Sequence, residues 1–182
     1  MKVTRTDIPE VLVLEPRVFS DARGHFLETY NRRAFREATG LDVEFVQDNQ
    51  SFSVRNVLRG LHYQIRQPQG KLVQVLFGEV FDVVVDLRRS SRTFKKWTAV
   101  DLSAATHRML WVPAGFAHGF LVRSEHALVI YKVTDYYAPE HERVLHWGDP
   151  TVGISWPQLD SDPLQSSRDA QGRRSDELEL FP

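Results

Sequence analysis

The sequence of 182 residues contains no cysteine, which excludes a disulfide framework, a thiolate metal site and a cysteine nucleophile. Neither sign of charge is in surplus. The chain has 23 lysine and arginine residues against 24 aspartate and glutamate residues, a formal net charge of -1. Because general binding to nucleic acid needs a basic surplus, we expect no nucleic-acid partner.

Long apolar runs are also missing. No run approaches the ~20 residues that a membrane-spanning helix needs, so we expect no membrane partner. Residues 1–7 lack the apolar core of a signal peptide. From these two observations we expect a cytoplasmic protein.

Helix signals are scarce, and most of the chain has the pattern of short strands. One short helix is predicted over residues 32–38, with Asn31 as its N-cap and Gly40 at its end. A hairpin-type turn is predicted at Gly78. The predicted strands cover residues 11–14, 26–30, 45–52, 57–64, 72–77, 80–87, 97–102, 108–112, 118–122 and 127–134. Short β-branched segments separated by turns indicate an all-β sandwich or barrel.

The end of the chain has a different composition. Prolines interrupt it, and residues 165–179 are mostly polar and charged, so we expect an irregular C-terminal extension over about residues 158–182. There is no internal repeat and no sign of a second domain. We therefore expect one domain over residues 1–182, with a barrel core at about residues 43–135.

Residues 57–64 and the nearby Lys71 combine functional groups that a plain core strand does not carry. Arg59, His62 and Tyr63 alternate with leucine and glycine, so polar groups on this strand are expected to face a cavity that takes a polar, anionic ligand. The alternative for His62 is a hydrogen-bonded structural histidine. Strict alternation also places Arg59 and His62 on opposite faces, unless Gly60 marks a bulge or one side chain reaches around the barrel rim.

Two motifs resemble those of the cupin barrels. Residues 113–118 look like the second cupin motif, and residues 60–62 look like part of the first. In metal-dependent cupins the first motif supplies two histidines and a carboxylate, but here Gln64 replaces the second histidine and Lys71 stands in the region of the acidic ligand. Two imidazoles beside an ammonium group make a poor metal site, so we expect neither a metal nor a cofactor.

Without a metal, the same residues suit proton transfer next to a carbonyl group. An imidazole can accept and release a proton near neutral pH, a phenol can return one, and a lysine or second histidine can stabilise an enolate oxygen. Arg23 and Arg59 suit phosphate contacts, although ordinary surface ion pairs are the alternative. The side chains of residues 47–49, including the Asp48 carboxylate, can bind hydroxyl groups or a base.

Taken together in chain order, the motifs resemble the dTDP-4-dehydrorhamnose 3,5-epimerase family. The resemblance spans nearly the whole chain and is highly specific. The motifs that carry it lie at residues 21–24, 58–64, 70–73, 80–88, 112–120, 131–132, 137–139, 149–150 and 154–157.

The resemblance implies a metal-free cupin jelly roll that acts as a homodimer and epimerises dTDP-4-keto-6-deoxyglucose at carbons 3 and 5. His62 falls at the family's general base, Asp169 at its partner, Tyr131 at the proton donor and Lys71 at the enolate contact. Tyr137 falls at the position that stacks on thymine. The other substrate-contacting positions are Arg23, Glu28, Gln47, Asn49, Arg59, His118, Glu142 and Arg168.

One departure lies next to the expected partner of the base, where the family's Leu-Ser-x-Lys-Asp pattern reads Gln-Ser-Ser-Arg-Asp at residues 165–169. Arg168 keeps the charge of the lysine but not its shape. Three other functions stay open: a single-centre epimerase or 3,4-ketoisomerase of the same sugar nucleotide, a non-catalytic binding protein, and, more distantly, a metal-dependent dioxygenase.

Overall fold

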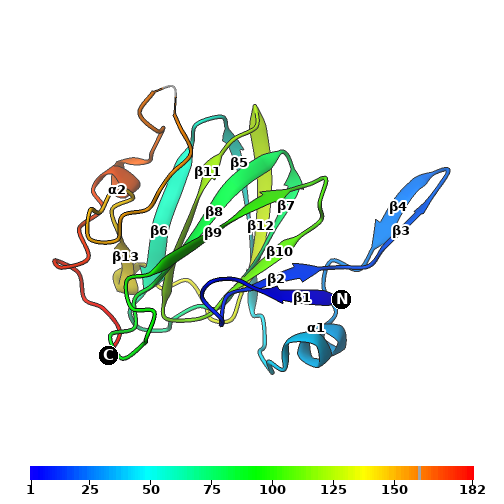
Figure 1. Ribbon diagram of the computed structural model, residues 1–182, viewed down its shortest axis with the longest axis horizontal. Helices are drawn as coiled ribbons and strands as arrows, with labels where there is room; N and C mark the ends of the chain where they lie inside the picture. The colour runs from blue at the N-terminus through cyan, green and yellow to red at the C-terminus, as the bar shows by residue number, and fades with distance from the viewer. Residues whose placement is uncertain (160) are drawn as a thin grey trace.

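The computed structural model describes residues 1–159 and 161–182, and the strands of these residues form two facing antiparallel sheets and a separate hairpin (Figure 1). The all-β prediction is confirmed. The six-stranded sheet has the order β1 (Lys2–Arg5), β2 (Leu12–Glu15), β10 (Met109–Val112), β7 (Lys71–Phe77), β12 (His126–Val133) and β5 (Gln47–Val54). The five-stranded sheet has the order β13 (Glu142–Val144), β6 (Leu58–Gln64), β11 (Phe116–Val122), β8 (Glu79–Asp86) and β9 (Trp97–Ser103).

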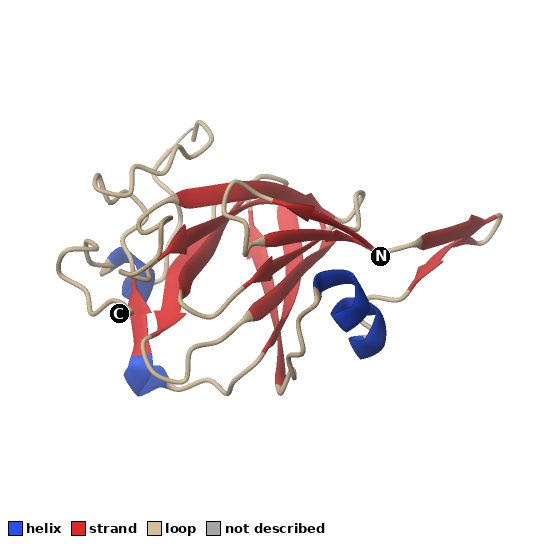
Figure 2. Ribbon diagram, turned by 60° about the horizontal axis from the view of Figure 1, so that its bottom comes forward, coloured by secondary structure: helices blue, strands red, loops and turns tan. Residues whose placement is uncertain are grey.

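The described residues form three apolar clusters, one between the two sheets and one on the outer face of each sheet. The largest lies between the sheets and contains Val73 and Val75 from β7 and Phe120 from β11, all almost fully buried. A second covers the outer face of the five-stranded sheet, where Leu180 of the tail packs. The third packs Phe35 of helix α1 (Arg32–Thr39) on the outer face of the six-stranded sheet. Both outer faces are therefore partly covered by segments outside the barrel (Figure 2).

The predicted N-terminal helix is confirmed, including its ends. The Asn31 side chain accepts a hydrogen bond from the Ala34 N–H at 3.1 Å, which satisfies a donor that the first helical turn leaves free. Gly40 ends the helix in the left-handed conformation with φ of 74°, and its N–H donates to the Arg36 carbonyl. None of the described helices is long and apolar enough to cross a membrane.

The hairpin predicted at Gly78 is wrong. The strands on either side of it, β7 and β8, belong to different sheets and do not pair with each other. Gly78 has φ of 79°, and a Cβ atom there would lie 2.0 Å from the His126 carbonyl oxygen. The single glycine therefore turns the chain from one sheet into the other, a path that leaves no room for a side chain.

The C-terminal tail (residues 161–182) contains a second helix, α2 (Ser167–Ala170), that the sequence analysis missed. A four-residue helix carries no hydrophobic periodicity, so its pattern could not be distinguished from a loop. Ser166 caps it by accepting a hydrogen bond from the Asp169 N–H at 3.1 Å. Backbone hydrogen bonds then fix the tail to the barrel, for example from the His146 N–H to the Arg173 carbonyl at 2.8 Å.

A bulge in β6 decides how Arg59 and His62 are oriented. His118 of β11 lies opposite His62, and Phe120 lies opposite Arg59, so three steps along β6 match two steps along β11. The extra residue reverses the alternation, and both side chains line one pocket. Of the two alternatives left open by the sequence, the bulge at Gly60 is therefore correct.

The third group of strands is a hairpin of β3 (Val18–Asp21) and β4 (Gly24–Leu27). It projects away from the two sheets, as Figure 1 shows at its right-hand edge. We call residues 18–27 the arm. Its aromatic side chains are exposed, with 49% of Phe19 and 68% of Phe26 accessible.

The close approach of β6 and β11 makes a testable prediction at Gly119. A Cβ atom there would lie 2.5 Å from the Arg59 carbonyl oxygen, so Gly119→Ala must push the strands apart. We expect the free energy of unfolding, measured with urea, to fall by about 1–3 kcal/mol. Gly148→Ala is the control, because its nearest contact would be the end of the His146 side chain at 3.3 Å. Equal unfolding midpoints for both variants would contradict the packing described.

Candidate active site

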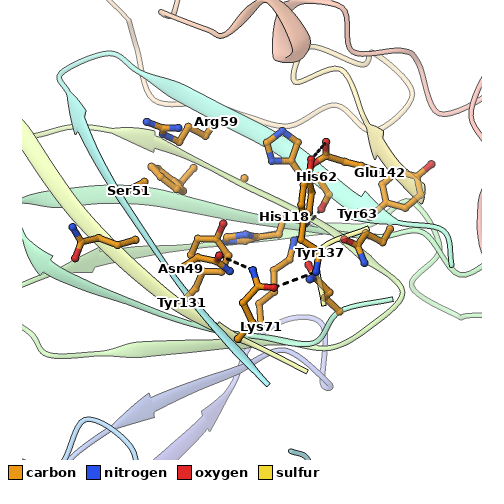
Figure 3. Close-up of a pocket in the computed structure, with 16 residues that line it drawn as sticks. Asn49, Ser51, Arg59, His62, Tyr63, Lys71, His118, Tyr131, Tyr137 and Glu142 are labelled. Atoms are coloured by element: carbon orange, nitrogen blue, oxygen red, sulfur yellow. Dashed lines mark hydrogen bonds between the residues drawn. The ribbon is translucent and has the colours of Figure 1, made fainter. Parts of the chain in front are cut away.

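A pocket with a volume of about 360 Å³ opens between the two sheets and contains most of the predicted site residues (Figure 3). One wall is formed by β5, β7 and β12 of the six-stranded sheet, and the other by β6 and β11 of the five-stranded sheet. Pockets of this size are typical sites for small molecules. Charged and polar side chains therefore face the cavity from both sheets.

His62 stands on the β6 wall and is held by the tail. Its Nε2 lies 2.5 Å from Oδ1 of Asp169, which is 107 residues later in the sequence and only 4% exposed. Burial acts to raise the pKa of Asp169, but hydrogen bonds from His62, Ser166 and the Gly60 backbone, together with the charge of His62 when it is protonated, outweigh this effect and leave the pKa lowered. The carboxylate therefore stays ionised and fixes both the orientation of the imidazole and the nitrogen that carries its proton.

Lys71 is a buried cation on the opposite wall. Its Nζ donates a hydrogen bond to the His62 carbonyl at 3.1 Å, and the residue is 7% exposed. Burial lowers the pKa of Lys71 to about 8, while the carboxylates of Asp82 and Glu142 act to raise it. At neutral pH the ammonium group is thus still mostly protonated and can donate hydrogen bonds into the pocket.

Tyr131 comes from β12, directly opposite Asn49 of β5 in the strand register. Burial raises the pKa of the Tyr131 phenol, although the nearby Arg59 guanidinium acts to lower it. At neutral pH the group is a neutral phenol, a proton donor that faces the same cavity as His62 from the other sheet.

His118 forms a second histidine–carboxylate pair at the bottom of the pocket. Its Nε2 lies 2.8 and 3.0 Å from the two oxygens of Asp82, which is completely buried. Our sequence analysis did not single out Asp82. Its position inside the apolar run of residues 80–85 was the available signal, because a buried acid in a strand needs a partner.

The inward face of β5 carries a row of polar side chains at every second residue: Gln47, Asn49, Ser51 and Ser53. Gln47 Nε2 donates to Asn49 Oδ1 at 2.7 Å. Ser53 Oγ accepts a hydrogen bond from Arg59 Nε at 2.9 Å and so positions the guanidinium. The two serines were also missed, although alternation from Gln47 and Asn49 predicts their direction.

Tyr137, Glu142 and Arg168 form a cluster at the end of the pocket opposite Arg59, as Figure 3 shows for the first two. The Tyr137 hydroxyl donates to Glu142 Oε2 at 3.2 Å and accepts from Arg168 Nη1 at 2.8 Å, while Arg168 also forms an ion pair with Glu142. The Tyr137 N–H donates to Gln47 Oε1 at 3.2 Å, which joins the cluster to β5. The arginine at the departure from the family pattern is thus tied to pocket residues.

Four predicted substrate contacts are not among the lining residues of this pocket: Arg168, which is bonded to Tyr137 and Glu142 at its end, and Asp48, Arg23 and Glu28. Asp48 faces the other side of β5, where it pairs with Lys132 at 2.9 Å. Arg23 pairs with Asp21 at 2.6 Å in the arm, and its side chain is 90% exposed. Glu28 follows the arm and accepts a hydrogen bond from Asn31. Asp48 points away from the pocket because side chains alternate between the two faces of a strand. Arg23 and Glu28 lie away from it because the arm projects from the two sheets.

Gln64 shows how the first cupin motif is used here. Its side chain is buried, donates to the carbonyls of Gln67 and Tyr136 at 2.7 and 3.2 Å, and accepts from the Ala138 N–H at 2.9 Å. The amide is thus fully occupied by backbone groups. No group of three or more His, Cys, Asp or Glu side chains within the described residues is arranged to hold a metal ion.

Comparison with known proteins identifies the family. The model of the dTDP-4-dehydrorhamnose 3,5-epimerase family matches residues 5–177. A dTDP-4-dehydrorhamnose 3,5-epimerase from Pseudomonas aeruginosa is 59% identical over 182 residues, 100% of both chains. The chain belongs to the dTDP-4-dehydrorhamnose 3,5-epimerase family. Members of this epimerase family are isomerases, and the resemblance expected from the motifs is confirmed.

Solved structures of related epimerases have the same fold. The crystal structure of dTDP-6-deoxy-D-glucose-3,5-epimerase from Legionella pneumophila, in complex with dTDP-4-keto-L-rhamnose, has a TM-score of 0.96 and 45% identity over 99% of this chain and 97% of that one. A 3′-monoepimerase from Streptomyces bikiniensis in complex with dTDP-quinovose has a TM-score of 0.88 and 34% identity, covering 97% and 88% of the chains. The predicted cupin-type jelly roll is confirmed.

The lowered pKa of Lys71 predicts a specific pH dependence of stability. Between a folded-state pKa of about 8 and the ordinary value of 10.5, the unfolded chain binds more protons than the folded one. The free energy of unfolding should therefore rise with pH, by about 2 kcal/mol between about pH 7.5 and about pH 9.5. Urea unfolding of the wild type and of Lys71→Met at each pH isolates this contribution. A constant difference between the two proteins would show that Lys71 has an ordinary pKa.

Proposed function

We propose that this chain converts dTDP-4-keto-6-deoxy-D-glucose to dTDP-4-keto-L-rhamnose by epimerisation at carbons 3 and 5. One observation carries the proposal: the side chains of His62 and Tyr131 face one cavity from opposite sheets. Inversion of a carbon requires removal of a proton from one face and its return to the other. Two groups on facing walls can do this without rotation of the bound sugar.

The first step is loss of the proton next to the 4-keto group, whose carbonyl acidifies both neighbouring C–H bonds. With the Nε2–H of His62 donated to Asp169, the basic lone pair lies on Nδ1, and this atom takes the proton. The electron pair of the C–H bond moves to the ketone oxygen. The imidazolium that results is stabilised by the ionised Asp169.

The enolate oxygen is stabilised by Lys71, with His118 as a second donor at the base of the cavity. Tyr131 then gives its proton to the carbon from the opposite face, and the carbonyl group reforms with inverted configuration. The tyrosinate regains a proton from solvent, and His62 releases one to solvent. Protons and electrons balance, and neither step needs an oxidant or reductant.

The rest of the pocket binds the nucleotide. Arg59 has no carboxylate within ion-pair distance in the described part of the chain, so its guanidinium is available for the diphosphate. Tyr137 offers an aromatic face for the thymine ring, with Gln47, Glu142 and Arg168 bonded around it. The roles that the family resemblance implies for these residues stay predictions. The same holds for the single domain over residues 1–182 and for the cytoplasmic location.

The test is proton NMR of dTDP-4-keto-6-deoxyglucose with the protein in deuterated water. Loss of both the carbon-3 and carbon-5 proton signals is the expected result. Exchange at one carbon alone would instead indicate a single-centre epimerase, the activity named for the Streptomyces bikiniensis relative. Binding without exchange would identify a binding protein or a different isomerase.

The same assay tests the base. His62→Ala should slow exchange at both carbons by about 10²–10⁴-fold, because the proton acceptor is removed. Binding of dTDP, measured by calorimetry, should be largely preserved, which serves as the control for folding. Exchange at the wild-type rate would remove His62 from the mechanism.

We also propose that the chain acts as a homodimer in which the arm of one copy reaches the pocket of the other. The arm exposes Phe26 and carries Arg23, which lies away from the pocket of its own chain. The outer face of the six-stranded sheet exposes Phe52 on β5, 59% accessible, and Leu76 on β7, 44% accessible, with β12 between the two strands. Apolar groups exposed on this scale mark interaction surfaces, and a second copy would cover them and bring Arg23 to an anionic ligand.

Mixing two inactive variants tests the exchange of arms. His62→Ala has an intact arm and a dead pocket, whereas Arg23→Ala has an intact pocket and a defective arm. If arms are exchanged, mixed dimers contain one complete site, and subunit exchange should restore about a quarter of wild-type activity. No restoration on mixing, with dimers shown by light scattering, would place each arm at its own pocket. A monomer in solution would contradict the dimer itself.

A further inference from the structure

The arm (residues 18–27) has few contacts with the rest of its own chain. Within the described residues its hydrogen bonds and ion pairs stay inside the hairpin, such as the pair of Arg23 with Asp21. None of the three apolar clusters includes an arm residue. Among the described residues, one aromatic contact joins the arm to the barrel: the ring centroids of His25 and His107 lie 4.6 Å apart, with the rings tilted by 54°. This pair of imidazoles is therefore where the barrel can hold the arm.

The backbone turns His107 toward the arm in an uncommon conformation. His107 lies between β9 and β10, directly after a turn in which the Thr106 N–H donates to the Ser103 carbonyl at 3.3 Å. Its φ is 54°, in the left-handed region that residues other than glycine seldom adopt. A conformation of this kind persists only where the surrounding structure supports it, and it is often found at functional sites. Here it brings the imidazole against His25.

Neither imidazole of the pair has a carboxylate beside it. The ion pairs of histidine in the described residues involve His62, His118 and His141, but not His25 or His107. The charged side chains of the neighbouring elements are already paired with one another: Asp21 with Arg23 on the arm, Glu15 with Lys2 and Arg108, and Glu79 and Asp101 with Arg123. Two neutral rings, or one neutral and one charged ring, can stay in contact, whereas two imidazolium ions repel each other.

We propose that His25 and His107 form a pH-sensitive contact that holds the arm against the barrel while at least one ring is neutral and releases it when both are protonated. Histidine changes its charge between about pH 5 and about pH 8, so the contact acts in this range. In water, two unit charges at this separation disfavour the held arm by about fivefold. His107 is thus a positioning residue for the arm and for the Arg23 that the arm carries.

The absence of cysteine allows a direct measurement of the arm. A single thiol introduced as Ala22→Cys, at an exposed position of the arm, takes a pH-insensitive fluorophore at one place only. Fluorescence anisotropy of this label reports how freely the arm moves. Between pH 8 and pH 5 the anisotropy should fall, as the ratio of held to released arms decreases by about fivefold.

Two variants in the labelled protein separate the charge from the ring. His25→Phe keeps an aromatic ring against His107 but cannot be protonated, so the anisotropy should stay high at both pH values. His107→Asn tolerates the left-handed backbone but removes the ring, so the anisotropy should be low at both. His146→Asn is the matched control, because the His146 ring stacks on Trp147 instead, and it should respond to pH as the wild type does.

The dissociation constant of dTDP, measured by calorimetry, tests the consequence for the pocket, which rests on the proposed function. If the arm brings Arg23 to the ligand, the ratio of this constant in the wild type to that in His25→Phe should rise by about fivefold between pH 8 and pH 5. The ratio cancels the titration of the phosphate and of the other histidines, which both proteins share.

An anisotropy that does not fall in the wild type, or that falls equally in His25→Phe, would overturn the contact. A fall only in the proteins with both histidines, with an unchanged ratio of dissociation constants, would support the contact and contradict the reach of the arm to a pocket. Failure of the proposed function is seen separately, since the wild type would then show no proton exchange or no dTDP binding at pH 8.

Discussion

The geometry of the site depends on how closely two strands approach each other at Gly60 and Gly119. A Cβ atom on Gly60 would lie 2.6 Å from the His118 carbonyl oxygen, so neither strand has space for a side chain at this point. The approach accommodates the extra residue in β6, and the extra residue turns Arg59 and His62 into one cavity. The guanidinium of Arg59 and the imidazole of His62 are thus brought into one cavity by backbone packing.

The C-terminal tail contributes one residue to the site that the barrel forms. It supplies Asp169 to His62, and further hydrogen bonds hold it against the barrel, such as the one from the Tyr63 hydroxyl to the Glu179 carbonyl at 2.6 Å. The Ser175 N–H donates to the buried Asp149 carboxylate at 2.7 Å. Because both anchors lie C-terminal to Asp169, the position of its carboxylate beside His62 is linked to the packing of an irregular segment on the outer face of the barrel.

The all-β class and the N-terminal helix could be predicted from the sequence because alternation and capping are local signals. The pocket residues on β6 and β7 were predicted from their mixture of charged and apolar side chains and from the family's motifs, since strict alternation separates Arg59 from His62. Gly78 was misread since a turn between strands has the same composition whether the strands pair or separate into two sheets. Asp48 was included with its neighbours although alternation along the strand predicted at residues 45–52 places its side chain on the face opposite Gln47 and Asn49. Asp82 and Ser51 were missed because neither can be interpreted without knowledge of its hydrogen-bond partners. The folded chain shows that Asp82 has a partner, His118, and that Ser51 Oγ has none within the described residues.

The hydrogen bonds of Gln64 also determine whether residue 64 could become a metal ligand by substitution. Its amide now closes the loops around Gln67 and Tyr136 and holds the backbone of Ala138. Replacement by histidine would restore one metal ligand of the cupin motif, but it would leave buried backbone groups unsatisfied at a cost of about 1–3 kcal/mol each. A single substitution at residue 64 therefore does not create the metal site of the metal-dependent cupins: the loops that Gln64 holds would have to be rebuilt as well.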